Sequence, residues 1–520
     1  MFSVGMAIPY FASLMTKSGI LHFLLSIPSS ILSYIVALIL STFFIRLFFF
    51  YFFALKIWRK VEKFKIEDLE KICAATNQKL PFFTIFIPAL NETEVIGNTI
   101  LTMAEINYPH NLYQIQVIVD EKEKLKAQPN KPTTRSVVEE MIEKFKTLYP
   151  ELKLTFTEVP YDFDGQSGGK CLGVEVPSTK GRALNYALSN IPKETDFCVF
   201  YDAEAGPNPD SFLAVAKNYL LDNKKLVFQL PVYQIRNFWS LSVFSKAAAL
   251  GQCFSHQYVL PFIFLFMPFI GGTNVFIHRQ FIENIENSEG FDNTILTEDI
   301  EIGVRLYTHF NQWPIFLPYP STEQTPPTMK AYHWQRYRWG YGLMQTLRKL
   351  FLELKDKTIE KAKRSKIKKM ILSLTFHGPF DWIIYYPLTL SASLLFILRI
   401  FKSIFSSILL YRFSLISSIP WNPVNDIFSF VILFFPIPSL LFLSYLLKHY
   451  WPYTNFHGAE KKSIRKQLFE WVVFMLFGAP IITSYYVFPY VHAFINFLLN
   501  PSRKAIWIRT KRTQEKHISI

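Results

Sequence analysis

Cysteine is scarce in this chain. Four of 520 residues are cysteines, and they are scattered at Cys73, Cys171, Cys198 and Cys253. No two of them form a CxxC pair, and no histidine stands at the spacing that zinc ligands show. This pattern predicts neither a disulfide framework nor a structural zinc site. We therefore expect free thiols and a reducing compartment.

Acidic residues are also in the minority, because 40 Asp and Glu stand against 55 Lys and Arg, which gives a net charge of +15. Such a positive net charge is compatible with three classes of binding partner: nucleic acid, anionic lipid or a phosphorylated substrate. The sequence has no zinc-finger spacing, RNP motif or basic heptad array, so no nucleic-acid partner is expected. Much of the basic excess stands beside apolar segments, which is typical of membrane proteins. These basic runs lie at residues 56–65, 361–369, 461–466 and 509–512.

The chain has no internal repeat and no low-complexity linker, and its first residues lack both a basic n-region and a small-residue cleavage site. We therefore interpret the N-terminus as a retained anchor and not as a signal peptide. Half of the residues are hydrophobic and 17% are aromatic, including 52 Phe. The charged residues are concentrated in one continuous region. This distribution predicts a soluble domain carried on membrane segments.

Four regions follow from this distribution. Residues 1–57 are predicted to be a membrane anchor of one or two helices, and residues 58–370 a cytoplasmic domain with interfacial helices towards its end. Residues 371–500 are predicted to hold three or four membrane helices, and residues 501–520 form a basic tail. A crossing needs roughly 20 apolar residues. The predicted spans lie at residues 31–53, near 379–400, near 427–447 and within 468–499.

Two features of these spans have physical consequences. Arg46 lies inside the first predicted span, so its side chain is expected to reach the interface or to face protein. The loop at 448–466 is rich in Lys and Arg, whereas the loop at 402–425 carries only two such residues. The positive-inside rule therefore places the soluble domain and the 448–466 loop on the cytoplasmic side.

The central region alternates short apolar runs with helix-like segments such as residues 92–106 and 134–149. This alternation predicts an α/β fold with a mostly parallel sheet and helices on both faces. In such sheets ligands bind beyond the carboxyl ends of the strands. The predicted strands are residues 82–90, 115–120, 153–159, 197–202 and 226–232.

Two carboxylates, Asp202 and Glu204, follow the predicted strand "CVFY" directly in the stretch "YDAEAGPNP". Acids beside Pro and Gly often form only a solvated turn. An Asp-x-Glu pair that leaves a strand can also present both carboxylates to one hard divalent cation, and Mg²⁺ and Mn²⁺ prefer such oxygens. In "STKGRALNYAL", Lys180 and Arg182 stand at a helix start, where cations are disfavoured by the helix dipole. This misplacement favours a bound phosphate there.

Three further motifs each have an ordinary structural alternative. Asp120 ends a strand in "VIVDEKE" and can accept hydrogen bonds from a uracil imide or a ribose, or it can be a solvated turn acid. The glycines of "GGTN" (271–274) allow close approach of backbone to a ligand. The stretch "LTEDIEIGVRL" opens with Glu298 and Asp299, which are either normal first-turn acids of a helix or a carboxylate general base.

The segment "QRYRWGYG" places Gln335, Arg338 and Trp339 on a single helical turn. A Trp beside an Arg can be an anchor at the membrane interface. It can equally form the floor of a sugar site, with the indole face against a pyranose ring.

In this order, the motifs between residues 82 and 345 resemble the membrane-bound family 2 glycosyltransferases, which include cellulose, chitin and hyaluronan synthases. "KGRALNYAL", "YDAEAGPNPD", "GGTN", "TEDIEIGVRL" and "QRYRW" are most similar to the bacterial XagB-type branch, and "NPSRKAIWIRTKR" is more loosely similar to the C-terminal tail of that branch. The resemblance implies a nucleotide-diphospho-sugar transferase (GT-A type) fold flanked by transmembrane helices. It also implies an inverting enzyme that uses a nucleotide-diphosphate sugar and a divalent metal, Mg²⁺ or Mn²⁺.

The resemblance also assigns donor-side roles. Asp120 would contact the nucleotide base, and Lys180 the nucleotide or its diphosphate. Asp202 and Glu204 correspond to the DxD motif, which binds the metal and the donor diphosphate. Two departures stand out: the second acid of the DxD motif is Glu, and "VDEKE" lacks the usual DDGS-like ending.

On the acceptor side, Asp299 of the TED motif would be the general base, supported by Glu298. The QxxRW motif would lie near the acceptor and the leaving diphosphate. The residues implied on this side are Gln335, Arg338, Trp339, Gly271, Gly272 and Thr273.

Together these features predict a membrane-embedded inverting glycosyltransferase of polysaccharide synthesis that acts on a glycan or lipid-linked acceptor. The branch implies a multi-pass protein of the bacterial inner membrane, with its catalytic domain in the cytoplasm and export partners that the sequence does not identify. Processive synthesis and single-sugar transfer both remain open. One alternative is a transporter or channel with a cytoplasmic regulatory domain, but the spans hold few of the ionisable residues it would need. A catalytically inactive transferase-like subunit is the other alternative, and the presence of the motifs with their key acids argues against it.

Overall fold

The computed structural model describes residues 29–59, 61–63, 65–126, 131–165, 176–286, 290–388, 448–454, 469, 485–501 and 512–515. The chain divides into two compact units, one of residues 1–49 and 385–437, the other of residues 50–384 and 438–520. The predicted span near 427–447, residues 389–400 of the span near 379–400, and residues 470–484 of the region 468–499 lie outside the described residues. The four-region division and the number of spans therefore stay predictions.

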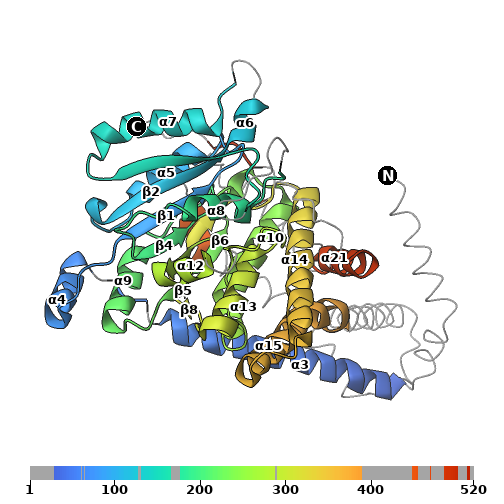
Figure 1. Cartoon of the computed structure of the whole chain (residues 1–520). Helices are drawn as coiled ribbons and strands as arrows, with labels where there is room; N and C mark the ends of the chain where they lie inside the picture. The colour runs from blue at the N-terminus through green and yellow to red at the C-terminus, as the bar shows by residue number, and fades with distance from the viewer. Residues whose placement is uncertain are drawn as a thin grey trace. The chain divides into compact units, whose positions relative to one another are not determined.

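A seven-stranded sheet forms the centre of the second unit, in the order β3-β2-β1-β4-β7-β5-β8 (Figure 1). Every residue of β2 is buried, as expected for a strand covered on both faces. Only β7 runs antiparallel, against both β4 and β5, so the predicted mostly parallel α/β sheet is confirmed. The strands are β1 (Phe83–Pro88), β2 (Tyr113–Asp120), β3 (Lys153–Val159), β4 (Phe197–Phe200), β5 (Val227–Gln229), β7 (Val275–His278) and β8 (Ile315–Phe316).

A second, two-stranded sheet pairs β6 (Val232–Gln234) with β9 (Ser321–Glu323) in parallel. Thr322 of β9 also forms an isolated bridge with Gly206, in the loop that follows β4. The small sheet is therefore attached by backbone hydrogen bonds to the segment that carries Asp202 and Glu204.

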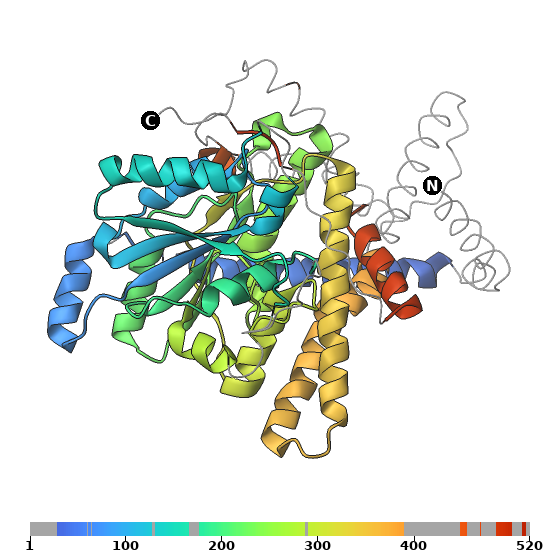
Figure 2. The same ribbon diagram turned by 45° about the horizontal axis from the view of Figure 1, so that its top comes forward.

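Helices cover both faces of the large sheet, as the sequence predicts, and each face has its own hydrophobic core (Figures 1 and 2). The predicted helices 92–106 and 134–149 are observed as α5 and α7, with α5 shorter than expected. One face is covered by α4 (Ile66–Thr76), α5 (Ile96–Ala104), α7 (Thr134–Leu148) and α9 (Ser211–Leu221). The other is covered by α8 (Lys180–Leu188), α12 (Arg279–Glu286) and α13 (Glu298–Phe310).

A third core lies where the long helix α14 (Met329–Lys355) packs against α13, α15 (Lys361–Thr375) and α21 (Phe488–Leu499). This core closes one side of the region beyond the strand ends, and α14 carries the "QRYRW" segment. The remaining elements are α6 (Glu121–Leu125), α10 (Val243–Phe254), α11 (Leu260–Ile263), η1 (His110–Leu112), η2 (Phe238–Ser240) and the π-helical η3 (Ser255–Val259) and η4 (Phe376–Tyr385).

Helix α3 (Ser29–Trp58) contains the one stretch of the described residues, Ser41–Trp58, that is long and apolar enough to cross a membrane. A single such helix is weak evidence for a membrane protein. Within the first unit, the Arg46 guanidinium lies 4.8 Å from the centre of the Tyr385 ring, so this cation faces protein, as predicted.

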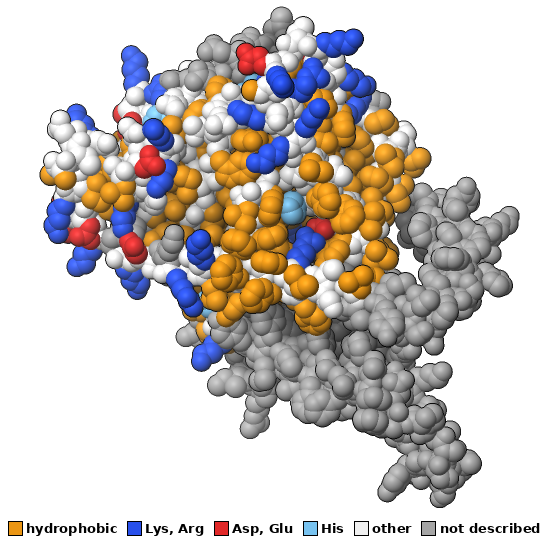
Figure 3. Space-filling view, turned by 90° about the horizontal axis from the view of Figure 1, so that it is seen from below, with side chains coloured by type: hydrophobic (Ala, Val, Ile, Leu, Met, Phe, Trp, Pro, Cys, Tyr) orange, Lys and Arg blue, Asp and Glu red, His pale blue; other side chains and the backbone are white. Residues whose placement is uncertain are grey.

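One face of the molecule is broadly hydrophobic, with Lys and Arg around much of it (Figure 3). In the second unit, a continuous series of ring contacts links Phe50 to Phe262, Phe262 to Phe266, and Phe266 to His377. Phe266 is 43% exposed and neighbouring Leu265 is 47% exposed. Large exposed apolar patches mark interaction surfaces, either with other proteins or with lipid.

Candidate active site

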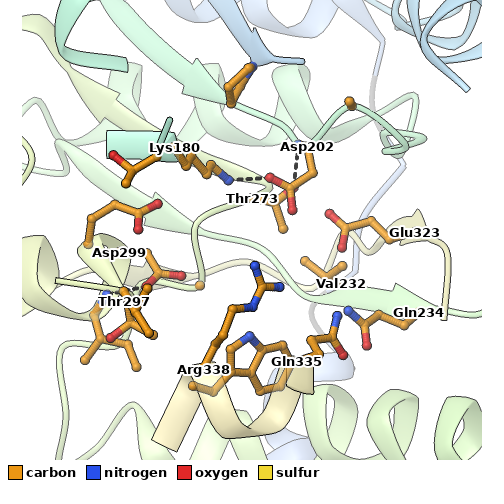
Figure 4. A pocket seen from close by; sticks show the side chains of 18 of the residues that line it. Lys180, Asp202, Val232, Gln234, Thr273, Thr297, Asp299, Glu323, Gln335 and Arg338 are labelled. Atoms are coloured by element: carbon orange, nitrogen blue, oxygen red, sulfur yellow. Dashed lines mark hydrogen bonds and ion pairs between the residues drawn. The ribbon is translucent and has the colours of Figure 1, made fainter. Parts of the chain in front are cut away.

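A cavity of about 350 Å³ lies beyond the carboxyl ends of β1, β2 and β4 (Figure 4). All the site residues predicted from the sequence line it except Gly272. Carboxylates outnumber cations among the described residues of its wall. The carboxylates are Glu92, Asp120, Asp202, Glu204, Glu298, Asp299 and Glu323, and the cations are Lys180, Arg338 and Arg512.

The acid pair of "YDAEAG" sits in a tight turn directly after β4, closed by a hydrogen bond from the Ala205 amide to the Asp202 carbonyl (3.0 Å). The Asp202 carboxylate binds the Lys180 ammonium. Glu204 is only 2% exposed, and its Oε1 lies 2.7 Å from Nη1 of Arg512. Its Oε2 is buried and has no hydrogen-bond partner among the described residues. Burial raises the pKa of Glu204 well above its usual range, although Arg512 acts in the opposite direction.

Lys180 is the first residue of α8, and the Thr179 side chain caps that helix by accepting from the Arg182 amide (3.1 Å). The Lys180 ammonium contacts Asp202 and donates to the Gly272 carbonyl at 2.7 Å. Burial alone would lower the pKa of Lys180, but the nearby carboxylates of Asp202 and Glu298 raise it above its usual value. The side chain is therefore a permanent cation inside the cavity.

Arg182 does not line the cavity, although the sequence suggested that it would meet a bound phosphate together with Lys180. Its side chain is 1% exposed, and its guanidinium pairs with Asp120 at 3.0 Å and donates to the Phe163 carbonyl. Asp120 is held further by Ser178 Oγ, which donates to it at 2.7 Å. Arg182 therefore fixes a carboxylate at the end of β2, and Lys180 alone of the two basic residues lines the cavity.

The "GGTN" loop contacts both Asp202 and Asp299. The Asp202 amide donates to Thr273 Oγ1 at 3.2 Å. Gly272 has φ +74°, and a Cβ built there would lie 2.7 Å from Oδ2 of Asp299. A side chain at position 272 would thus be strained and would push Asp299 away. The loop acts by positioning these acids, whereas its predicted contact with acceptor or diphosphate stays a prediction.

Asp299 lies in the first turn of α13, and its Oδ1 accepts a hydrogen bond from the Ile300 amide at 2.8 Å. Burial raises the pKa of Asp299 to about 6, although Lys180 acts to lower it. Burial also raises the pKa of neighbouring Glu298, and the Asp299 charge adds to this effect. Since a general base works best with a pKa close to the operating pH, Asp299 is suited to accept a proton.

Helix α14 presents Gln335, Arg338 and Trp339 to the cavity from one face, since residues three and four apart are neighbours on a helix. Figure 4 shows the Arg338 guanidinium pointing into the space between Asp299 and Glu323. Burial and the nearby Arg512 lower the pKa of Arg338 to about 10, which leaves it charged at neutral pH. The predicted grouping of these three residues with the acids is therefore observed.

Close approach of α14 to the start of α13 depends on Gly342. A Cβ at this position would lie 2.3 Å from Oγ1 of Thr297, so no other residue leaves room for the contact. Thr297 directly precedes Glu298 and Asp299. Gly342 thus allows the first turn of α13, which carries Glu298 and Asp299, to pack against α14, which carries Arg338.

Sequence reasoning missed three charged residues of the cavity. Glu323 ends β9, and each of Asp202, Glu204 and Glu323 offers an oxygen within 4.8 Å of the others. Burial raises the pKa of Glu323 to about 7, and the Asp202 charge contributes. Arg512, from the basic tail, approaches both Glu204 and Glu92, the latter at 3.7 Å. For Arg512, the signals in the sequence were the basic run at residues 509–512 and the loose similarity of the tail "NPSRKAIWIRTKR" to a family tail.

The three clustered carboxylates fit a hard divalent cation. Mg²⁺ and Mn²⁺ take carboxylate oxygens and share their coordination with substrate phosphates. Glu204 Oε2 and Glu323 Oε1 are both buried and have no hydrogen-bond partner in the described part of the chain. Buried acids in that condition need either protons or a cation. The cavity thus combines a candidate cation site, three basic side chains and a separate candidate base.

Comparison with known proteins identifies one family model. The model described as "Glycosyl transferase family group 2" matches residues 198–498, which is more than half of the chain. That match includes the acid pair after β4, the start of α13 and the face of α14 that lines the cavity.

Several curated proteins are similar to about half of this chain. The probable glycosyltransferase YdaM of Bacillus subtilis is 26% identical over 288 residues, covering 54% of this chain and 60% of that protein. Glucomannan 4-beta-mannosyltransferase 7 of Arabidopsis thaliana is 24% identical over 295 residues, covering 56% of this chain and 48% of that protein. Beta-monoglucosyldiacylglycerol synthase of Synechocystis is 24% identical over 279 residues, covering 52% and 49%. The chain spans about half the length of most of the curated relatives it matches.

Among solved structures, the mannosyltransferase PcManGT from Pyrobaculum calidifontis, in complex with GDP-Man and Mn²⁺, aligns with 86% of this chain and 98% of its own. The sequence identity is 17% and the TM-score is 0.41. The residues of the cavity themselves show which chemistry it can support.

Proposed function

Because this chain belongs to glycosyl transferase family group 2, we propose that its cavity transfers a sugar from a nucleotide-diphosphate donor to an acceptor hydroxyl, with inversion at the anomeric carbon. The proposal includes a GT-A type fold and a cytoplasmic catalytic domain held at a membrane. The single observation that supports it most is the placement of two separate acid groups, Asp202 with Glu204 and Asp299, on one cavity.

Membership of the family confirms the family 2 assignment made from the motifs, and with it the prediction of a transferase enzyme. The alternative of a transporter or channel is not favoured. The narrower placement among cellulose and hyaluronan synthase-like enzymes of the XagB-type branch stays a prediction. The same holds for the roles of individual site residues and for the bacterial inner membrane.

On the donor side, Asp202, Glu204 and the neighbouring Glu323 would hold a divalent metal ion, Mg²⁺ or Mn²⁺. Such an ion, when bound, supplies positive charge for the leaving diphosphate. Lys180 and Arg338 lie in the same cavity and would stabilise the remaining charge as it develops. Asp120, fixed by Arg182, would accept hydrogen bonds from the nucleoside.

On the acceptor side, Asp299 would remove the proton of the attacking hydroxyl. The acceptor oxygen then forms its bond to the anomeric carbon as the bond from that carbon to the diphosphate oxygen breaks. A single displacement of this kind inverts the anomeric centre. The Asp299 carboxylate gains the proton, and the nucleoside diphosphate leaves with the electron pair of the broken bond.

The acceptor is proposed to be a glycan or a lipid-linked molecule. The cavity wall also includes apolar and aromatic side chains, among them Met267, Leu343 and Trp382. The hydrophobic face of Figure 3 and the apolar stretch Ser41–Trp58 of α3 support membrane attachment of the chain. Relatives named for mannosyl and glucosyl transfer support a hexose as the transferred sugar, within polysaccharide or glycolipid synthesis.

A donor screen tests the proposal. The full chain, purified in detergent, is heated with GDP-mannose, UDP-glucose or UDP-N-acetylglucosamine, each with and without Mn²⁺. We expect one donor to raise the melting temperature in a Mn²⁺-dependent manner, because ligand binding stabilises the folded state. No response to any sugar nucleotide would contradict the proposal. Sizing the labelled product then separates processive synthesis from single-sugar transfer.

The rate of transfer should increase with pH through the titration of Asp299. Its pKa of about 6 means that the carboxylate is protonated, and inactive as a base, at lower pH. A bound cation lowers the pKa of nearby acids, so we expect the inflection of kcat at or below about pH 6. Initial rates at saturating donor between pH 4.5 and 8 measure it. A rate that falls as pH increases through this range would contradict the role of Asp299 as base.

A further inference from the structure

Glu323 is the one acid of the carboxylate cluster that lies outside every recognised motif. We propose that Glu323 is a third ligand of the divalent cation, together with Asp202 and Glu204. The inference rests on the proposed function and adds a residue to its metal site.

The backbone places Glu323 opposite the acid pair. β9 pairs with β6, so that Glu323 lies beside Gln234. Thr322, the preceding residue, exchanges two backbone hydrogen bonds of 2.8 Å with Gly206. Gly206 is two residues beyond Glu204, so this bridge ties β9 to the turn of the acid pair. The position of the Glu323 side chain therefore follows from main-chain pairing and does not depend on a flexible loop.

The burial of the carboxylate oxygens favours a cation as their partner. Glu204 is 2% exposed and Glu323 is 3% exposed, yet Oε2 of the former and Oε1 of the latter have no hydrogen-bond partner among the described residues. Both side chains line the cavity. A buried carboxylate oxygen without a partner is costly unless a proton or a cation satisfies it.

The cations already present do not complete this cluster. The Lys180 ammonium is engaged with Asp202 and with the Gly272 carbonyl. Among the described residues, Arg512 forms an ion pair with one acid of the cluster, through Oε1 of Glu204. Oxygens of Asp202, Glu204 and Glu323 lie within 4.8 Å of one another, and no Lys or Arg of the described residues forms an ion pair with all three acids. A hard divalent ion bound by carboxylate oxygens supplies a positive charge that all three can share.

Metal binding by the full chain in detergent, without nucleotide, tests this assignment. The signal of free Mn²⁺ in electron paramagnetic resonance gives the dissociation constant. We expect Glu323→Gln, which keeps the size of the side chain, to weaken Mn²⁺ binding by about 10-fold or more. Asp202→Asn should do the same. Glu353→Gln is the matched control, because Glu353 is a partly buried acid paired with Lys363 at 2.7 Å outside the cavity, and it should not change binding.

A second variant keeps the test independent of a general loss of structure. In Glu323→Cys, a thiolate would replace the carboxylate in the coordination shell, so bound Co²⁺ should show a thiolate-to-metal charge-transfer absorption band. The melting temperature of each variant without metal serves as the folding check. Bound Co²⁺ without that band, together with a Mn²⁺ dissociation constant for Glu323→Gln within twofold of wild type, would overturn the assignment.

The outcomes separate this inference from the proposed function. If Asp202→Asn loses Mn²⁺ and Glu323→Gln does not, Glu323 is not a ligand and the proposed function stands. If the wild-type chain binds no Mn²⁺ either alone or with a donor that stabilises it, then both the metal site and the assignment of Glu323 fail.

Discussion

Replacing Asp299 with Asn should lower the rate of sugar transfer by about 10²- to 10⁴-fold, the range that general-base catalysis contributes. An amide has almost the same shape as a carboxylate but cannot accept the proton of the acceptor hydroxyl. The hydrogen bond from the Ile300 amide to Oδ1 can be kept by the Asn oxygen. Donor affinity should therefore change little, and the loss should fall on kcat. Initial rates with labelled donor, together with the donor dissociation constant, measure both quantities.

Asp292→Asn is the matched control for this prediction. Asp292 belongs to the segment that leads into α13 and is paired with Lys349 at 2.7 Å, outside the cavity. The variant should transfer sugar at nearly the wild-type rate. If Asp299→Asn also retained that rate, the base would lie elsewhere. Glu298, whose pKa is likewise raised by burial, would then be the first residue to test by substitution with Gln.

The parts of the site that follow directly from the sequence are those in which a short local pattern, such as a strand end or a helical spacing, sets where the side chains lie. Asp202 and Glu204 end a strand of strongly apolar residues, and a parallel sheet opens at such ends. Gln335, Arg338 and Trp339 share a helical face because of their spacing alone. In each case the local chain sets the direction of the side chains, so a few neighbouring residues carry the information.

Other parts depend on pairings between distant segments. The antiparallel strand β7 was not predicted, because its four residues give no indication of strand direction. Glu323 enters the site through the pairing of β9 with β6, about 90 residues earlier, and "STEQTPP" shows no local pattern for that contact. Arg182 looked like a phosphate ligand, but its pairing with Asp120 across 62 positions removes it from the cavity wall. Burial decided that outcome, and burial is a property of the whole fold.

Replacing Arg338 with Ala should lower kcat by about 10²- to 10³-fold, comparable to the loss of one preorganised donor at a developing negative charge. Its guanidinium points into the cavity between Asp299 and Glu323, and it stays charged because its pKa remains near 10. As the bond to the diphosphate breaks, charge builds on the leaving group, and we expect Arg338 to stabilise that charge more in the transition state than in the bound donor. The donor KM should therefore change much less than kcat.

Arg338→Lys should recover part of the lost rate, because it restores the charge without the planar guanidinium fork. Arg348→Ala is the control on the same helix: its side chain is directed to the Pro501 carbonyl and does not line the cavity, so the rate should be unchanged. Steady-state kinetics on the wild type and the three variants give kcat and the donor KM for each. If Arg338→Ala raised KM and left kcat intact, Arg338 would contribute equally to binding of the donor and of the transition state. Lys180 would then be the next cation to test for an effect on the leaving group.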